Sequence, residues 1–172
     1  MFNRQKDMTA GNQRLAPSQD GQISREQLIF LLNEDLAREY QAIIAYVVYS
    51  QVIKGAANMA IAQELEKHAK EELEHALTIA KQIDYLGGTP TVAPLPVKMS
   101  TDDQELLRLD LANENETVRN YRERVVQCES LGEYAMAEQI RAILVQEQEH
   151  QIDLATALGK DVAEVAAAEE LA

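Results

Sequence analysis

The sequence predicts an all-α protein, built as a four-helix bundle with one long crossover between its second and third helices. Three observations support this fold class. The 172 residues include only seven Gly and four Pro, and 46% are apolar, which favours long helices around a full core. Four segments repeat apolar residues at helical spacing. Short turns separate the first two segments and the last two, whereas a proline-containing segment separates the middle pair.

The first two helices are expected between residues 24 and 88. Ser24 followed by Gln27 has the form of a capping box, so the first helix should begin there. A break at Lys54-Gly55 leads into the second helix, and Gly87-Gly88 should end it. Because the turn is short, these two helices should be antiparallel neighbours.

The second pair of helices follows an extended connection. Residues 87–101 contain three prolines and no helical period, so they can cross the whole bundle. Ser100 or Thr101 is expected to cap the third helix, which should run to about Cys128. A Leu-Gly turn follows, and Gly159 should close the fourth helix.

The chain length predicts one domain with a tail at each end. We expect a flexible tail over 1–22, the bundle over 23–159, and a short helix or tail over 160–172. The net charge of −13 favours cations as partners and argues against nucleic acid. A single cysteine excludes an internal disulfide framework and a Cys-rich metal site. The sequence has no run near the ~18 apolar residues of a membrane span and no signal-peptide pattern, so we expect a cytoplasmic protein without a membrane partner.

Two copies of a Glu-x-x-His pattern carry the strongest chemical signal. They are Glu72 with His75 on the second predicted helix and Glu147 with His150 on the fourth. Residues three apart on a helix share a face, so each pair can point to one spot. Both pairs fall on the apolar stripe of their helix, where a charged group is costly unless it is paired or bound to metal.

The two halves of the sequence repeat with an offset of 75 residues. Glu39 and Glu114 lie on apolar stripes at that offset, as do Tyr46 and Tyr121, and the offset also relates the two Glu-x-x-His pairs. Such a duplication predicts a pseudo-two-fold axis that places four Glu and two His around one cavity. This donor set suits two divalent ions and favours iron or manganese. Incidental buried ion pairs are the competing interpretation, but no Lys or Arg falls at the matching core positions.

The pattern resembles the site of ferritin-like di-iron proteins, in which two helices each supply a Glu and two supply Glu-x-x-His. Within that superfamily the chain looks most like bacterioferritin and the Dps-like proteins with a bacterioferritin-type site. The resemblance covers residues 24 to about 158 and rests on NEDLAREYQAIIAY, EELEHALTIAKQIDYLGGTP and QEQEHQIDLATALG. It implies that Glu72 and Glu147 bridge two irons, that Glu39, Glu114, His75 and His150 are terminal ligands, and that Tyr46 lies beside the site.

The resemblance implies a ferroxidase in a homo-oligomeric cage. Each subunit would bind two Fe ions, with Mn or Zn as other metals, and oxidise Fe(II) with O2 or H2O2. This would serve iron storage and protection from oxidative stress. The alternative is a di-iron or di-manganese peroxidase, catalase or oxygenase that retains its metals and stores no iron.

Two departures from the bacterioferritin pattern change these expectations. Leu73 stands where bacterioferritins place a haem-binding Met, so haem bound in that mode is not expected. The segment after His150 is short for the fifth helix of a 24-subunit cage, which keeps a 12-subunit shell open as well. Dps-like members with this site often carry a cysteine pair, whereas Cys128 is alone.

Several residues near the predicted site have two interpretations. Tyr46 and Tyr121 would bind a ligand carboxylate or supply an electron, or else would be ordinary core tyrosines. Asp35 and Asp110 would orient the two ligand histidines, or would be exposed helix acids.

His68 and Cys128 are also open. His68 lies one turn before the second-helix Glu-x-x-His pair and is either an accessory iron site or a hydrogen-bonded core histidine. Cys128 is expected to pack as a small hydrophobe rather than to act as a redox centre.

Overall fold

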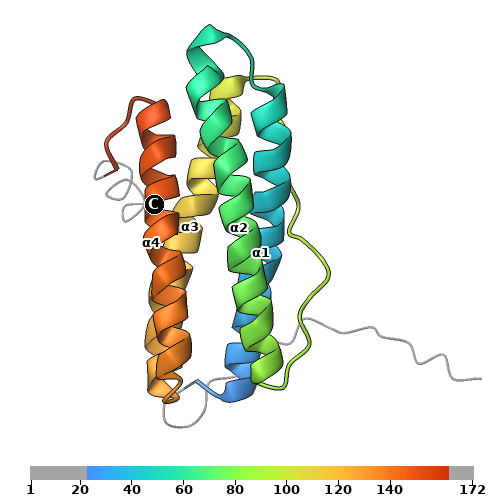
Figure 1. Ribbon diagram of the computed structural model, residues 1–172, viewed down its shortest axis with the longest axis vertical. Coiled ribbons are helices and arrows are strands. Elements are labelled where there is room, and N and C mark those ends of the chain that lie inside the picture. The colour runs from blue at the N-terminus through green and yellow to red at the C-terminus, as the bar shows by residue number, and fades with distance from the viewer. Residues whose placement is uncertain (1–22, 163–172) are drawn as a thin grey trace, which may run out of the picture.

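A computed structural model describes residues 23–162, which form a bundle of four long helices (Figure 1). These are α1 (Arg25–Val52), α2 (Met59–Tyr85), α3 (Asp103–Ser130) and α4 (Tyr134–Ala157), with a short 3-10 helix, η1 (Ala56–Asn58), before α2. The all-α class, the four helices and the crossover between α2 and α3 are confirmed. The tail predicted over 1–22 and most of the segment predicted over 160–172 lie outside the described residues.

The helix starts follow their capping residues. At α1 the predicted capping box is present: Gln27 N donates to Ser24 Oγ (3.2 Å), and Ser24 N donates to Gln27 Oε1 (2.7 Å). At α3 the prediction of Ser100 or Thr101 is wrong, because Asp102 is the cap and accepts a hydrogen bond from Gln104 N (2.9 Å). A carboxylate is well suited to this place because the helix N-terminus carries unpaired N–H groups and partial positive charge.

The crossover runs along the outside of α1 from one end of the bundle to the other (Figure 1). Hydrogen bonds spaced along the segment hold it there. They join Thr91 N to Asn33 Oδ1 (2.6 Å), Leu95 N to Ala37 O (3.0 Å), Gln41 Nε2 to Pro96 O (2.6 Å), and Tyr49 OH to Lys98 O. This segment lets α3 begin at the opposite end of the bundle from the end of α2.

The apolar core is divided into two clusters. One cluster includes Leu28 and Leu32 of α1 with Ile79 of α2, and the other includes Leu65 of α2 with Leu154 of α4. On every helix the residues between the two clusters include buried acids or histidines. The core is therefore interrupted at mid-height by a polar layer. Within residues 23–162, no helix is both long and apolar enough to cross a membrane.

Candidate metal centre

The polar layer in the middle of the bundle brings all six predicted ligands together. α2 and α4 each contribute a Glu-x-x-His pair, while α1 and α3 each contribute one Glu. None of the six residues is more than 2% exposed. They are Glu39, Glu72, His75, Glu114, Glu147 and His150. The 75-residue repeat thus corresponds to a cluster in space, with ligand candidates from all four helices.

Glu72 and Glu147 each face both histidines. Glu72 places Oε1 2.9 Å from Nδ1 of His150 and Oε2 3.4 Å from Nδ1 of His75. Glu147 places Oε1 3.0 Å from Nδ1 of His75 and Oε2 3.5 Å from Nδ1 of His150. Each carboxylate therefore directs one oxygen to each histidine, as a carboxylate that bridges two cations must.

The other two glutamates each join one side of the cluster. Glu39 Oε2 lies 3.5 Å from Nδ1 of His75. Glu114 belongs to the His150 side, where the four candidate ligand atoms lie within 4.8 Å of one another. Two ligand atoms on one cation, each at about 2.1 Å, are separated by about 3.0 Å in octahedral and about 3.4 Å in tetrahedral geometry. The observed separations suit two neighbouring cations.

The clustered atoms are close together, but several of them make no hydrogen bond. Nδ1 of both histidines, Oε2 of Glu39 and both carboxylate oxygens of Glu147 are buried without a hydrogen-bond partner. A buried polar atom left unpaired costs about 1–3 kcal/mol. Two ligand atoms that bind the same cation lie close together without forming a hydrogen bond to each other. The buried atoms of this cluster are arranged in that way. The residues present therefore fit a pair of metal ions.

The pKa values show how the cluster behaves without metal. Burial raises the pKa of Glu39 and of Glu114 well above the ordinary value, and the charges of Glu72 and Glu147 raise it further. Burial alone would lower the pKa of His150, but the surrounding carboxylates outweigh burial and raise it to about 11. The metal-free cluster therefore retains protons, which metal ions would displace on binding.

Two tyrosines connect α1 and α3 across the cluster. Tyr46 of α1 donates its hydroxyl to Glu114 Oε1, and Tyr121 of α3 donates to Glu39 Oε1. Burial raises the pKa of both hydroxyls well above 10, so both remain protonated donors. The hydrogen-bonding interpretation thus fits both tyrosines equally, whereas a role in electron supply stays a prediction.

The outer nitrogens of the two histidines contact residues that the sequence analysis did not single out. His150 Nε2 lies 3.0 Å from Glu71 Oε2, and His75 Nε2 lies 2.9 Å from Gln146 Oε1. Each partner immediately precedes the Glu of the opposite Glu-x-x-His pair, and the two partners are 75 residues apart. The 75-residue spacing, and the position of each partner directly before a Glu-x-x-His pair, could have identified both residues from the sequence. One histidine has a carboxylate partner and the other an amide.

Both predictions for Asp35 and Asp110 are wrong. The two aspartates are buried, and they contact neither ligand histidine. Asp35 instead accepts two hydrogen bonds from Arg124, at 2.6 Å from Nε and 3.1 Å from Nη2. This bidentate contact raises the pKa of Arg124 although burial opposes it. Among residues 23–162 no cation pairs with Asp110 and its Oδ2 has no hydrogen-bond partner, and burial raises its pKa well above the ordinary value. Asp35 lies one turn from Glu39 and faces the same helix α3, but it meets Arg124 there rather than a ligand histidine.

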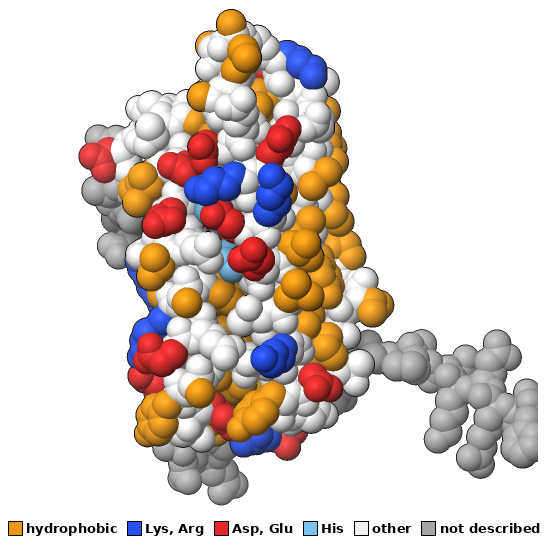
Figure 2. Space-filling model, viewed as in Figure 1, with side chains coloured by type: hydrophobic (Ala, Val, Ile, Leu, Met, Phe, Trp, Pro, Cys, Tyr) orange, Lys and Arg blue, Asp and Glu red, His pale blue; other side chains and the backbone are white. Residues whose placement is uncertain are grey.

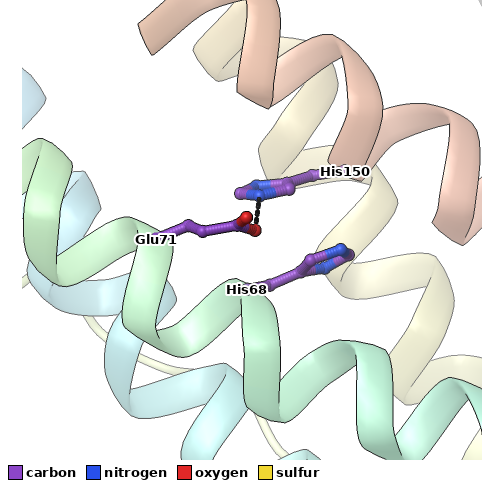
Figure 3. Close-up of side chains that lie close together, drawn as sticks. All are labelled: His68, Glu71 and His150. Atoms are coloured by element: carbon purple, nitrogen blue, oxygen red, sulfur yellow. Dashed lines mark hydrogen bonds and ion pairs between the residues drawn. The ribbon is translucent and has the colours of Figure 1, made fainter.

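His68 is buried against His150. The two rings are stacked with centroids 4.0 Å apart and an interplanar angle of 29°, and Glu71 contacts the His150 ring (Figure 3). Burial and the nearby His150 lower the pKa of His68 to about 4, so the ring is neutral. Cys128 lies in an apolar cluster, and burial raises the pKa of its thiol to about 11, as a packed hydrophobe requires.

A small pocket reaches the cluster from the surface between α1 and α3. It is lined by the four candidate glutamates and by Arg38, Gln41, Ala42, Asn113 and Thr117. This is the place where the described surface comes nearest to all four carboxylates.

The fold and the cluster together define a class, namely four-helix-bundle proteins with a Glu-and-His cluster in the bundle core. The family model "Ferritin-like domain" matches residues 29–162. The chain therefore belongs to the ferritin-like family, which confirms the resemblance seen in the sequence.

Individual relatives are more distant. The bacterioferritin of Brucella melitensis is 24% identical over 142 residues, covering 78% of this chain and 88% of the relative. The bacterioferritin of Rhodobacter capsulatus is 28% identical over 125 residues, covering 72% and 78%. These identities are too low to fix an activity, and it is the family match that places the chain among the ferritin-like proteins.

Solved structures show the same architecture. A ferritin-like diiron-carboxylate protein from Bacillus anthracis aligns with a TM-score of 0.76 and 34% identity, covering 79% of this chain and 99% of that one. A dodecameric thioferritin related to bacterioferritin, from Bacteroides fragilis, aligns with a TM-score of 0.73 and 27% identity, covering 88% and 93%. The likeness extends over nearly the whole of both neighbours.

Proposed function

We propose that this protein is a ferroxidase that oxidises Fe(II) at the central cluster and stores the product inside a homo-oligomeric cage. The observation that carries the proposal is the bridging arrangement of Glu72 and Glu147, each with one oxygen toward His75 and one toward His150. Two Fe(II) ions bound as a pair supply the two electrons that reduce O2 to H2O2 with uptake of two protons, or H2O2 to two waters.

The chain's own residues have separable roles in this reaction. Glu72 and Glu147 would hold both ions, while His75 with Glu39 and His150 with Glu114 would each hold one. The tyrosine hydroxyls fix the orientation of the two outer carboxylates, because each donates to one carboxylate oxygen and leaves the other free to bind metal. The surrounding apolar clusters keep bulk water away from the ions.

The proposed cage is supported by an apolar surface on α1 and α2. Large hydrophobic side chains are exposed there, and Figure 2 shows hydrophobic side chains gathered along one edge of the molecule. The exposed large hydrophobic residues of α1 and α2 include Phe30, Ile44, Val47, Leu73 and Leu77. Exposed apolar area of this kind is typical of subunit contacts. Leu73, which is half exposed, offers no sulfur ligand, so we propose a cage without haem bound at this position.

The decisive experiment compares Fe(II) oxidation by the wild type with that by the double variant Glu72→Ala, His75→Ala. We expect the variant's rate to fall to that of Fe(II) in buffer, about 100-fold or more, because one bridging ligand and one terminal ligand are lost. Glu149→Ala is the matched control, since Glu149 is an exposed acid of α4 and should leave the rate unchanged. A double variant as fast as the parent would show that the site is elsewhere.

Iron content and particle size separate storage from turnover. A large particle that takes up many irons per chain supports the proposal. A small particle that saturates at two ions per chain and then turns over peroxide or an organic substrate would instead identify a metal-retaining di-iron or di-manganese enzyme.

A further inference from the structure

The groove between α2 and α4 has different chemistry on its two sides. One side carries Glu64, His68, Glu71 and Asp153. The residues 75 positions away, on the related side, are Gln139, Ile143, Gln146 and Thr78, and they line a pocket that reaches His75. The four positions on the first side thus carry three acids and an imidazole, whereas their four counterparts on the related side carry only uncharged side chains. The 75-residue repeat relates the two sets of positions, which differ in the charge of their side chains.

His68 is the fixed element of the charged side. Its side chain has no exposure, its Nε2 lies 3.3 Å from Asp153 Oδ2, and its Nδ1 has no hydrogen-bond partner. Since only Nε2 faces an acceptor, the proton of the neutral ring belongs on Nε2; a cation bound there would take the lone pair of Nε2, and the proton of the still neutral ring would lie on Nδ1. The separation of 3.3 Å is longer than a good hydrogen bond, and it lies within the about 3.0–3.4 Å expected of two neighbouring ligands on one cation.

Glu64 completes a three-ligand set from the solvent side. Ligand atoms of Glu64, His68 and Asp153 all lie within 4.8 Å of one another. The side chains of Glu64 and Asp153 are 46% and 40% exposed, so an ion held there would keep water in its remaining positions. Two carboxylates and one neutral imidazole balance the charge of a divalent ion and suit the first-row transition metals.

Lys67 is the one cation that the described residues place against this group. Its Nζ lies 3.7 Å from Glu64 and 3.8 Å from Glu71. Both contacts are long and solvent-exposed, so each contributes at most about 1 kcal/mol. Figure 2 shows acidic side chains interspersed with Lys or Arg over this face of α2 and α4. A metal ion can therefore displace the ammonium.

We propose that Glu64, His68 and Asp153 form a third divalent-metal site, separate from the central pair, which holds a partly hydrated transition-metal ion beside it. Through the stacked rings of His68 and His150, this ion is adjacent to the ligands of the central cluster. The site requires only metal binding, so it stands or falls independently of iron oxidation.

Zinc titration of the metal-free, full-length protein tests the site without redox chemistry. We expect three Zn²⁺ per chain in the wild type and two in the double variant Glu64→Gln, Asp153→Thr. These replacements are the residues of the uncharged side, and the ion pair of Asp153 is made to His68 rather than to His150. His68→Ile should have the same effect. Glu138→Gln is the control for general loss of surface acid and should retain three ions.

The strength and place of the third site give further readouts. Each single replacement should weaken the third ion at least about tenfold and leave the first two unchanged. Lys67→Ala, which matches Ala142 of the other half, should tighten the third ion a few-fold. Anomalous scattering from zinc should locate it within bonding distance of His68. If the wild type saturates at two ions, or if the Glu64 and Asp153 double variant still binds three, the proposal is wrong.

Discussion

The two halves of the bundle present the same inner side chains but surround them differently. Asp35 of α1 is paired with Arg124, whereas its counterpart Asp110 of α3 has a buried, unpaired oxygen. The outer nitrogen of His150 faces a carboxylate, whereas that of His75 faces an amide. A dinuclear site needs matching ligand atoms on both sides, but it does not need matching surroundings. The two metal positions should therefore differ in affinity although their ligands are alike.

The largest difference between the halves should appear in stability. Asp35→Asn leaves Arg124 as a buried cation without its partner, which costs about 3–5 kcal/mol. Urea unfolding of the metal-free protein measures the effect, with Asp110→Asn as the matched control. If the two variants lost the same free energy of unfolding, the ion pair between Asp35 and Arg124 would make no net contribution to stability.

Exchanging the histidine partners should exchange the affinities of the two metal positions. Glu71→Gln should weaken the ion at His150 about 10–100-fold, because a carboxylate makes the imidazole a better donor than an amide does. Gln146→Glu should strengthen the ion at His75 by a similar factor. Stepwise Co²⁺ titration, followed by absorption, measures both. If neither variant changes the affinities of the two Co²⁺ binding steps, the outer partners of the histidines do not cause the difference between the two metal positions.

Asp110→Asn should stabilise the metal-free protein, and the gain should grow with pH. Burial raises the pKa of Asp110 well above its ordinary value, so the folded state favours the protonated carboxyl. Stability is then lost as pH rises from the unfolded value of about 4 toward the folded value. The variant has no such loss and should gain about 1–3 kcal/mol near pH 7 but almost nothing near pH 4. Unfolding curves across this range would refute the prediction if the gain were constant.

The smallest effects should come from the tyrosines, where the halves agree. Tyr46→Phe and Tyr121→Phe each remove one hydrogen bond to an outer carboxylate, at about 1 kcal/mol, and should slow Fe(II) oxidation by the same few-fold factor. Single-turnover kinetics compares them. A much larger loss in Tyr46→Phe alone would indicate that this tyrosine supplies an electron and that here, too, the halves differ.

Sequence periodicity was sufficient for the fold and for the inner cluster. The capping box at Ser24, the prolines of the crossover and the glycines after α2 and α4 act locally, so their effect can be predicted without knowing the neighbouring helices. Glu39 and Glu114 could be found because a duplication fixes their register against the Glu-x-x-His pairs. The cap of α3 was misplaced because several adjacent residues can cap a helix, and only the backbone path selects Asp102.

Contacts between helices could not be predicted in the same way. Arg124 was not expected in the core, because an arginine is rarely buried without a partner and its partner is on another helix. Glu71 and Gln146 look like ordinary surface residues in the sequence, since only the packing of α2 against α4 turns them toward the histidines. Helical spacing shows which residues share a face, but the rotation of each helix decides which neighbour that face meets.

The crossover fastens two helical hairpins together from the outside of the bundle. Each hairpin holds one lone Glu and one Glu-x-x-His pair, so two copies of a single hairpin would contain the whole inner cluster. The two hairpins of this one chain thus correspond to the two subunits of a hairpin dimer. In a true dimer every substitution occurs twice, and a buried Arg opposite one aspartate would also appear opposite the other. A single polypeptide is free of that restriction: position 124 is an arginine paired with Asp35, while its counterpart 49 is a tyrosine that donates a hydrogen bond to Lys98 O of the crossover.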